Sequence, residues 1–390
     1  MATIKNIEAR KILDSRGKET IEVKITTDDG QMATDSVPSG TSTGSFEAVA
    51  LEPDIAINNV NEVIRPKLMG MNPADQGSID KIMIDLDATA NKSKLGANAI
   101  LGVSLAVSRV AAATAKMPLY QYLNELFNRI AGQKIKPNIP LPMMVMIEGG
   151  KHAEESKTCI QEFLCITTLE IGERIWTRLK KILSQAGIGT KIGLEGGFTP
   201  NLEYDEDGIR LIEDAIREEG LSIPGHVRLG LDIAGNHCQM TLDDIVTLLH
   251  RYPIMSLEDP FAENEWDHWG ELKLALDQRQ KEYLLIGDDL FVTNEERFQK
   301  GISDFVANSI IIKLNQVGTL SETLGVIAKA KVANFTHILS HRSGETMDTF
   351  ISDLAVATAA PFLKSGAPYA SERVAKYNRL KEIAKEIEGN

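Results

Sequence analysis

Short apolar runs in the second half of the chain end, one after another, on residues that can do chemistry. The runs VRLGLD, PIMSLE, YLLIGD, SIIIK and HILSHRS are typical of buried strands. Their ends follow one another at intervals of 23 to 30 residues, which suits a strand followed by a crossover helix. The end positions are Asp232, Glu258, Asp288, Lys313, the group His341, Arg342 and Ser343, and then Lys364 in PFLKSG.

These ends would meet if the strands formed a parallel barrel, because active sites of barrels lie at the C-terminal rim. Asp232, Glu258 and Asp288 would then face one another. Neighbouring carboxylates raise one another's pKa unless a cation neutralises them, and a set of oxygen ligands suits a hard cation such as Mg²⁺. Taken singly, each acid could instead cap the following helix, and Lys313 could simply extend from a strand end into water.

The same residue types suggest proton abstraction beside a carboxylate. A lysine close to a divalent cation has its ammonium form disfavoured, so Lys313 could act as a base. A metal ion can stabilise the dianion that forms when the proton leaves. Glu195, in KIGLEGGFTP, precedes two glycines that allow a close approach of the ligand, and it is a candidate general acid. Arg342 could grip a phosphate through two donors, with Lys364 as a second cation.

The elements that would position these groups differ between the two ends of the chain. In TIEVKITTDDGQ, alternating apolar residues and Asp29-Gly30 predict a β-hairpin. VPSGTSTGSFEA is typical of a mobile loop, and residues 54–127 have a helical pattern. KPNIPLP, at 136–142, indicates a connector. We therefore expect two domains that meet at this connector, the first with a hairpin and helices and the second built from βα units.

The composition narrows the class of partner. The 390 residues carry a net charge of -13, which argues against bulk attraction to nucleic acid or to an anionic membrane. The N-terminus lacks the apolar core of a signal peptide, and we expect no stretch apolar enough to span a bilayer. Three cysteines without metal-type spacing suit a reducing compartment, and the core does not need disulfides. We expect a cytoplasmic protein that acts on a small anion.

The chain resembles the enolase family, phosphopyruvate hydratase, over nearly its full length. The resemblance rests on stretches that occur in order: ARKILDSRG, VPSGTSTG, LGANAILGVSLA, QEF, EGGFTP, SLEDPFAE, GDDLFVTN, IIIKLNQVGTLSET, SHRSGET and SERVAKYN. It implies reversible dehydration of 2-phosphoglycerate to phosphoenolpyruvate, a glycolytic step, with two Mg²⁺ ions. It also implies an α/β fold with a small α+β N-terminal domain, at 1–135, and an enolase-type (β/α)8 barrel, at 136–390, whose first strands depart from regular βα order. It further implies a homodimer.

The resemblance also implies roles for individual residues. Asp232, Glu258 and Asp288 would hold the first metal ion, and Ser39 would complete the second metal site. Lys313 would be the base and Glu195 the acid, with Glu162 assisting. The other substrate-binding residues would be His152, Gln161, His341, Arg342, Ser343 and Lys364. Without the motifs, His152 would be an ordinary surface histidine and Ser39 an ordinary turn serine.

Several positions depart from the family pattern, so the chain is identified as a shortened and divergent member. Leu194 stands where the family usually has Asp, and Glu148 stands where it usually has Asn. The spacing from His152 to Gln161 is one residue longer, the stretch after Asp232 is IAGNHC, and the C-terminal tail is curtailed. Two alternatives stay open. One is a catalytically impaired homologue that serves as a binding or structural protein. The other is a related lyase that acts on a non-phosphorylated acid.

Overall fold

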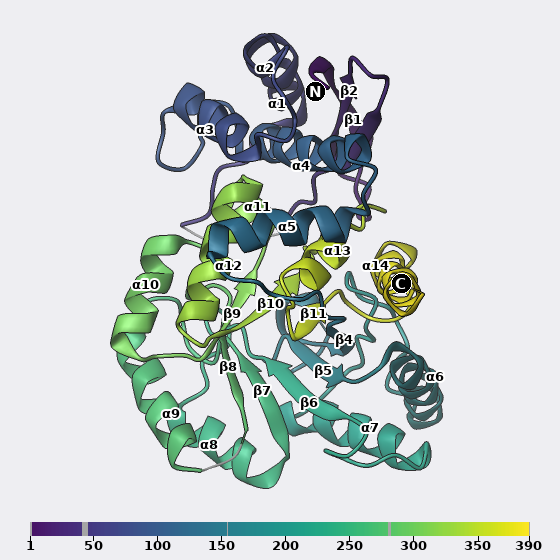
Figure 1. Ribbon diagram of the computed structural model, residues 1–390. Helices are drawn as coiled ribbons and strands as arrows, with labels where there is room; N and C mark the ends of the chain where they lie inside the picture. Colours follow the sequence, from purple (N-terminus) through teal and green to yellow (C-terminus); the bar gives the residue numbers. More distant parts are fainter. Residues whose placement is uncertain (1, 41–45, 154, 280–281, 390) are drawn as a thin grey trace.

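The computed structural model describes residues 2–40, 46–153, 155–279 and 282–389, and it places a small sheet with helices above a larger barrel (Figure 1). The predicted mobile loop includes residues 41–45, which lie outside the described residues. The small sheet is antiparallel, in the order β1 (Ile4–Leu13), β2 (Glu19–Thr27) and β3 (Met32–Ser36). The turn at Asp29-Gly30 joins β2 to β3, as the hairpin signal predicted.

Helices cover the small sheet and lead towards the barrel. They are α1 (Pro53–Asn58), the π-helix η1 (Asn59–Ile64), α2 (Arg65–Leu68), α3 (Gln76–Asp87), α4 (Ala97–Thr114) and α5 (Leu119–Ala131). Alternating residues of β2, namely Ile21, Val23 and Ile25, are fully buried, because one face of the strand packs against α4. The Ala-rich sequence of α4 allows this close approach, and Gly102 lies directly against Val23.

Eight strands close the barrel in the order β10-β11-β4-β5-β6-β7-β8-β9. Their bounds are β4 (Leu141–Glu148), β5 (Glu162–Ile166), β6 (Arg228–Asp232), β7 (Ile254–Glu258), β8 (Leu284–Gly287), β9 (Ser309–Ile312), β10 (Thr336–Ser340) and β11 (Phe362–Lys364). The barrel interior is filled by apolar side chains such as Val145, Ile311 and Ile338. The barrel therefore has a packed core below its mouth.

One strand runs against the others. β5 pairs antiparallel with both β4 and β6, whereas the remaining neighbours are parallel. The start of β5 therefore lies at the same end of the barrel as the C-terminal ends of β4 and β6. In register, Glu162 is opposite Glu148 on one side and Asp232 on the other. The expected departure from regular βα order thus lies at β5.

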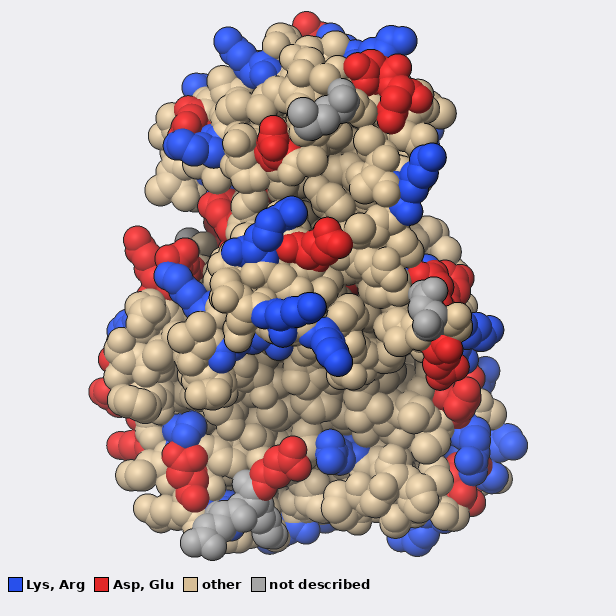
Figure 2. Space-filling view, in the orientation of Figure 1, with Lys and Arg blue, Asp and Glu red and all other residues tan. Residues whose placement is uncertain are grey.

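The remaining helices surround the barrel and connect its strands. They are the short 3₁₀-helix η2 (Gly150–His152), α6 (Leu169–Ala186), α7 (Asp205–Glu218), α8 (Leu242–Arg251), α9 (Trp266–Gln278), α10 (Glu295–Asp304), α11 (Leu314–Val317), α12 (Leu320–Val332), α13 (Phe350–Ala357) and α14 (Ser371–Glu388). Side-chain caps start several of them, as Thr168 does for α6 and Thr319 for α12. Figure 2 shows basic and acidic side chains interspersed on the face viewed.

Two expectations from the sequence are corrected. By length and composition α4 is apolar enough to cross a membrane, but 83% of its apolar window is buried inside the fold, as in a core helix. Cys159 and Cys238 form a disulfide, although the size of the core suggested that none was needed. Cys165 is a buried free thiol. The division into domains at residue 135 stays a prediction, and no helix or strand is described between α5 and β4.

The contact between α4 and β2 predicts the effect of one methyl group. A Cβ added at Gly102 would lie 2.6 Å from the Val23 Cγ2 atom, and both sites are buried. We expect Gly102→Ala to destabilise the protein by about 1–3 kcal/mol, since the overpacking outweighs the gain in helix propensity. Gly325→Ala, in α12, is the matched control, because no atom lies within 4 Å of its added Cβ. Thermal unfolding should show a lower midpoint for Gly102→Ala alone. Equal midpoints would contradict the packing described.

Candidate active site

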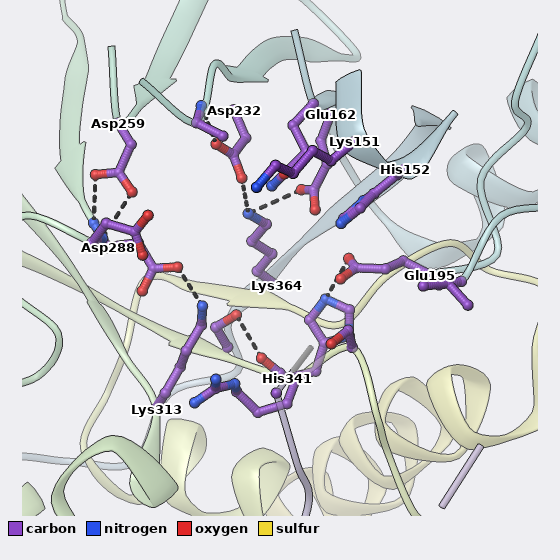
Figure 3. A pocket seen from close by; sticks show the side chains of 18 of the residues that line it. Lys151, His152, Glu162, Glu195, Asp232, Asp259, Asp288, Lys313, His341 and Lys364 are labelled. Atoms are coloured by element: carbon purple, nitrogen blue, oxygen red, sulfur yellow. Dashed lines mark hydrogen bonds and ion pairs between the residues drawn. The ribbon is translucent and has the colours of Figure 1, made fainter. Parts of the chain in front are cut away.

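A cavity of about 320 Å³ opens at the mouth of the barrel, where the ends of the strands meet loops from both parts of the chain. Figure 3 shows its charged side chains converging from different strands. β6, β7 and β11 end at Asp232, Glu258 and Lys364, while Asp288 and Lys313 directly follow β8 and β9. The predicted strand ends therefore do meet at one rim. Predicted residues that line the cavity are His152, Gln161, Glu162, Glu195, Asp232, Asp288, Lys313, His341, Arg342, Ser343 and Lys364.

Lys364 occupies the centre of a buried group of acids. Its Nζ lies 2.7 Å from Glu258, 3.0 Å from Glu162 and 3.3 Å from Asp232. Although burial opposes it, these carboxylates hold the pKa of Lys364 well above its usual range. Burial raises the pKa of Glu258 to about 8, even with Lys364 beside it. One lysine therefore does not fully neutralise the three acids.

A second ion pair joins Lys313 to Asp288. Burial disfavours the ammonium form of Lys313, but Asp288 raises its pKa overall. In return, Lys313 outweighs the effect of burial on Asp288 and lowers the pKa of that carboxyl. Lys313 is thus held in its charged form by the acid beside it. For Lys313 to act as a base, Asp288 must bind another partner, so that it no longer raises the pKa of Lys313.

The three predicted metal ligands fit a hard divalent cation in chemistry. All three supply carboxylate oxygens, and Oε1 of Glu258 is buried without a hydrogen-bond partner among the described residues. The two ammonium groups at Lys313 and Lys364 supply positive charge where the sequence predicted a cation. Among the described residues, two groups have potential ligand atoms that all lie within 4.8 Å of one another inside the group. One group is His152, Glu162 and Glu195, and the other is Asp259, Asp288 and Asp289. The predicted trio of Asp232, Glu258 and Asp288 is not one of these groups.

Glu195 comes from a loop and not from a strand end. It lies in the turn 193–197, which packs against β4 through bridges at Phe198. Its Oε2 is 3.0 Å from Nε2 of His341. Burial alone would raise the pKa of Glu195, but His341 holds it well below its usual range. Burial and the charge of Glu195 raise the pKa of Glu162 well above its usual value, although Lys364 opposes the shift.

Arg373, in α14, sets the orientation of His341. Its Nη1 lies 2.5 Å from Nδ1 of His341 and also donates to the carbonyl of Arg342, at 2.6 Å. Because a guanidinium only donates, Nδ1 must accept, and the N–H at Nε2 faces Glu195. Burial also lowers the pKa of His341. His341 is therefore held with its Nε2 directed at the Glu195 carboxyl, 3.0 Å away.

The N-terminal part of the chain supplies partners for Arg342 and Ser39. Arg342 Nη1 lies 3.1 Å from Glu47 and donates to Asn315 at 2.9 Å. The Ser39 hydroxyl donates to Asp14 at 3.0 Å and accepts from Arg16 at 2.7 Å. Ser39 is therefore close to the mouth, through backbone hydrogen bonds with Gly344, but it does not line the cavity.

Several residues near the cavity were not singled out from the sequence. Asp259 accepts from the backbone amides of Asp288 and Asp289, at 3.0 and 2.8 Å, and so fixes the turn that carries the predicted ligand. The pairs of adjacent acids in SLEDP and GDDL are the sequence signal that could have identified Asp259 and Asp289. Lys151 and His237 line the cavity 3.1 Å apart, but they join two loops with no shared motif.

Two family models match the chain, in the order of its two structural parts. The model for the enolase N-terminal domain matches residues 4–123. The model for the enolase C-terminal TIM barrel domain matches residues 136–244 and 236–390. The matched ranges include the small sheet and every strand of the barrel. They support an enzyme of the enolase lyase superfamily, and the chain belongs to the enolase family.

Proposed function

We propose that this protein catalyses the reversible, Mg²⁺-dependent dehydration of 2-phosphoglycerate to phosphoenolpyruvate. The observation that carries the proposal is that a candidate base and a candidate acid enter one cavity from different sides. Lys313 reaches in from one side, and Glu195 with Glu162 reaches in from another (Figure 3). Removing a proton from C2 needs a base, and expelling the C3 hydroxyl needs an acid.

Lys313 is the proposed base. It is partly buried and paired with Asp288, one of the proposed ligands of the first metal ion. Asp232 and Glu258 would hold the same ion, and Ser39 would complete the site of a second. When bound, Mg²⁺ supplies positive charge that stabilises the extra negative charge of the substrate carboxylate. With Asp288 engaged elsewhere, Lys313 loses the partner that raises its pKa, and its neutral form becomes accessible.

Glu195 and Glu162 are the proposed source of the proton for the departing hydroxyl. Their oxygens lie within 4.8 Å of each other and of a His152 nitrogen. The raised pKa of Glu162 keeps a proton within the pair, next to the ionised Glu195. We assign the final transfer to Glu195, with Glu162 assisting, so that the hydroxyl leaves as water.

The basic residues of the mouth suit an anionic, phosphorylated substrate. Arg342 and Ser343 would hold the phosphate, and Lys364 the carboxylate. His341, Gln161 and His152 would complete the lining. The net charge of -13 does not oppose this, because the cations converge locally. A homodimer in the cytoplasm, without nucleic-acid or membrane partners, remains a prediction from the sequence and the family.

The acids of the mouth predict a metal requirement. We expect the purified protein to form phosphoenolpyruvate from 2-phosphoglycerate with Mg²⁺ and to lose this activity with a chelator. Asp288→Ala should abolish high-affinity Mg²⁺ binding in calorimetry, because one of three ligands is gone. Glu295→Ala, on the exposed surface of α10, is the control and should bind as the wild type does. Unchanged binding by Asp288→Ala would remove it from the ligand set. An inactive wild-type protein that binds Mg²⁺ would favour the impaired homologue.

The phosphate assignment predicts that Arg342→Lys is damaging although it keeps the charge. A lysine loses the planar two-donor fork, so we expect kcat/KM to fall about 10-fold or more. Affinity for 2-phosphoglycerate should also weaken as salt increases. Steady-state kinetics at several salt concentrations measure both effects. Wild-type kcat/KM in Arg342→Lys would show that Arg342 does not hold the phosphate.

The division between base and acid predicts different residual reactions. Glu195→Gln should form product about 100-fold more slowly or worse, since it cannot donate a carboxyl proton. If the reaction is stepwise, this variant should still exchange the C2 proton of 2-phosphoglycerate with D₂O. Lys313→Ala should lose both reactions. NMR of the C2 proton distinguishes the cases: exchange that persists in Lys313→Ala would refute the base assignment, and a product rate retained by Glu195→Gln would move the acid to Glu162.

A further inference from the structure

Glu148, the last residue of β4, is a fully buried acid that does not line the cavity. It lies behind the turn 193–197, which carries Glu195. The backbone amide of Glu148 donates to the carbonyl of Phe198 at 2.8 Å, so the end of the strand and the end of the turn are joined directly. Its carboxylate is therefore directed at the turn from underneath.

The carboxylate of Glu148 is the acceptor for two amides of that turn. Its Oε1 accepts from the backbone N–H of Glu195 at 3.0 Å and of Gly197 at 2.9 Å. The turn also fits around the carboxylate, because a Cβ added at Gly193 would lie 2.5 Å from the Cδ atom of Glu148. A side chain at position 193 would therefore displace the acid.

The carbonyl groups of the same turn have other partners. The carbonyl of Leu194 accepts from Arg373 at 3.1 Å, and that of Glu195 accepts from the amide of Ala367 at 2.8 Å. The carbonyl of Gly196 accepts from Nε1 of Trp176 at 3.2 Å. Glu148 thus accepts from the amides of the turn, while Arg373, Ala367 and Trp176 donate to its carbonyl groups.

The second oxygen of Glu148 faces His152. Its Oε2 is 3.6 Å from Nδ1 of His152, and neither atom has a hydrogen-bond partner among the described residues. A nitrogen of His152 also lies within 4.8 Å of oxygens of Glu162 and Glu195. One carboxylate is therefore next to both the backbone of Glu195 and the side chain of His152.

We propose that Glu148 is a positioning residue that fixes Glu195, and through it the proton-donating side of the cavity. The sequence around it fits this role. The residue before Glu195 is Leu194, whose side chain is exposed, so no acid adjacent in sequence can hold the turn. An acid from β4 holds it instead. The expected effect on catalysis rests on the proposed function. The expected effect on the turn rests on the hydrogen bonds alone.

The kinetic test compares Glu148→Met with Glu148→Gln. Methionine has a similar size but accepts neither amide, whereas glutamine keeps a carbonyl oxygen that can accept both. In Glu148→Met, we expect the kcat for product formation to fall about 10-fold or more, since a misplaced acid slows only the step it serves. KM should stay within about 3-fold, and C2 proton exchange in D₂O should persist. Glu148→Gln should recover most of the lost kcat.

The control is another buried carboxylate that accepts from a backbone amide but does not line the cavity. Asp80, in α3, accepts from the amide of Ser321 at 3.0 Å. Asp80→Ala should destabilise the fold but leave the ratio of product formation to C2 exchange unchanged. If Glu148→Met keeps wild-type kcat, or if it loses both reactions together, the proposal is overturned.

A second measurement does not depend on the substrate. Amide hydrogen exchange of the peptide covering 193–198, in the protein alone, should be faster in Glu148→Met than in the wild type and in Asp80→Ala. Unchanged protection would show that Glu148 does not hold the turn. If the wild type does not convert 2-phosphoglycerate, the proposed function fails, and this measurement still decides whether Glu148 fixes Glu195.

Discussion

Buried like charges at the mouth of the barrel constrain the rest of the structure. Asp232, Glu258 and Glu162 surround the ammonium group of Lys364, and Asp288 pairs with Lys313 nearby. Removing one member of such a group from a low-dielectric site leaves an uncompensated charge, which is strongly unfavourable. The strand ends must therefore hold acids and lysines together in register. A divalent cation would alter these ion pairs, because it would compete with Lys313 and Lys364 for the carboxylates.

The small N-terminal sheet and its loops complete this arrangement. Glu47 pairs with Arg342, and Asp14 with Arg16 holds the hydroxyl of Ser39 beside the segment that follows β10. The pair of Glu47 and Arg342 joins residues 295 positions apart in the sequence. The barrel supplies the converging charges, while the N-terminal part covers one side of them. Both parts therefore contribute residues to one cavity.

The reversed strand β5 and the turn 193–197 bring the proton-donating side into place. Because β5 is antiparallel to its neighbours, its first residue, Glu162, lies at the mouth beside Asp232. Glu195 reaches the same place from a turn attached to β4. These two carboxyls interact across the cavity and have opposite pKa shifts, since Glu195 is next to the N–H of His341 and Glu162 is buried near a charged neighbour. Two acids of the same type thus have pKa values shifted in opposite directions by their surroundings.

The sequence by itself determined the alternation of strands and helices, the N-terminal hairpin, and the strand ends at Asp232, Glu258, Asp288, Lys313 and Lys364. Apolar periodicity and turn residues are local signals, so they can be read without the fold. Closure of these strands into a barrel was expected from the family resemblance. No strand pattern could place Glu195 or Glu162: the two glycines after Glu195 made it a candidate acid, and only the motifs of the family named Glu162. Tertiary structure alone decided the disulfide between Cys159 and Cys238, the burial of the apolar helix α4, and the contacts of Glu148 with the turn that carries Glu195. Each of these depends on which distant segments pack together. A hydrogen bond or ion pair between residues far apart in the chain leaves no periodic signal, so it appears only once the barrel has closed.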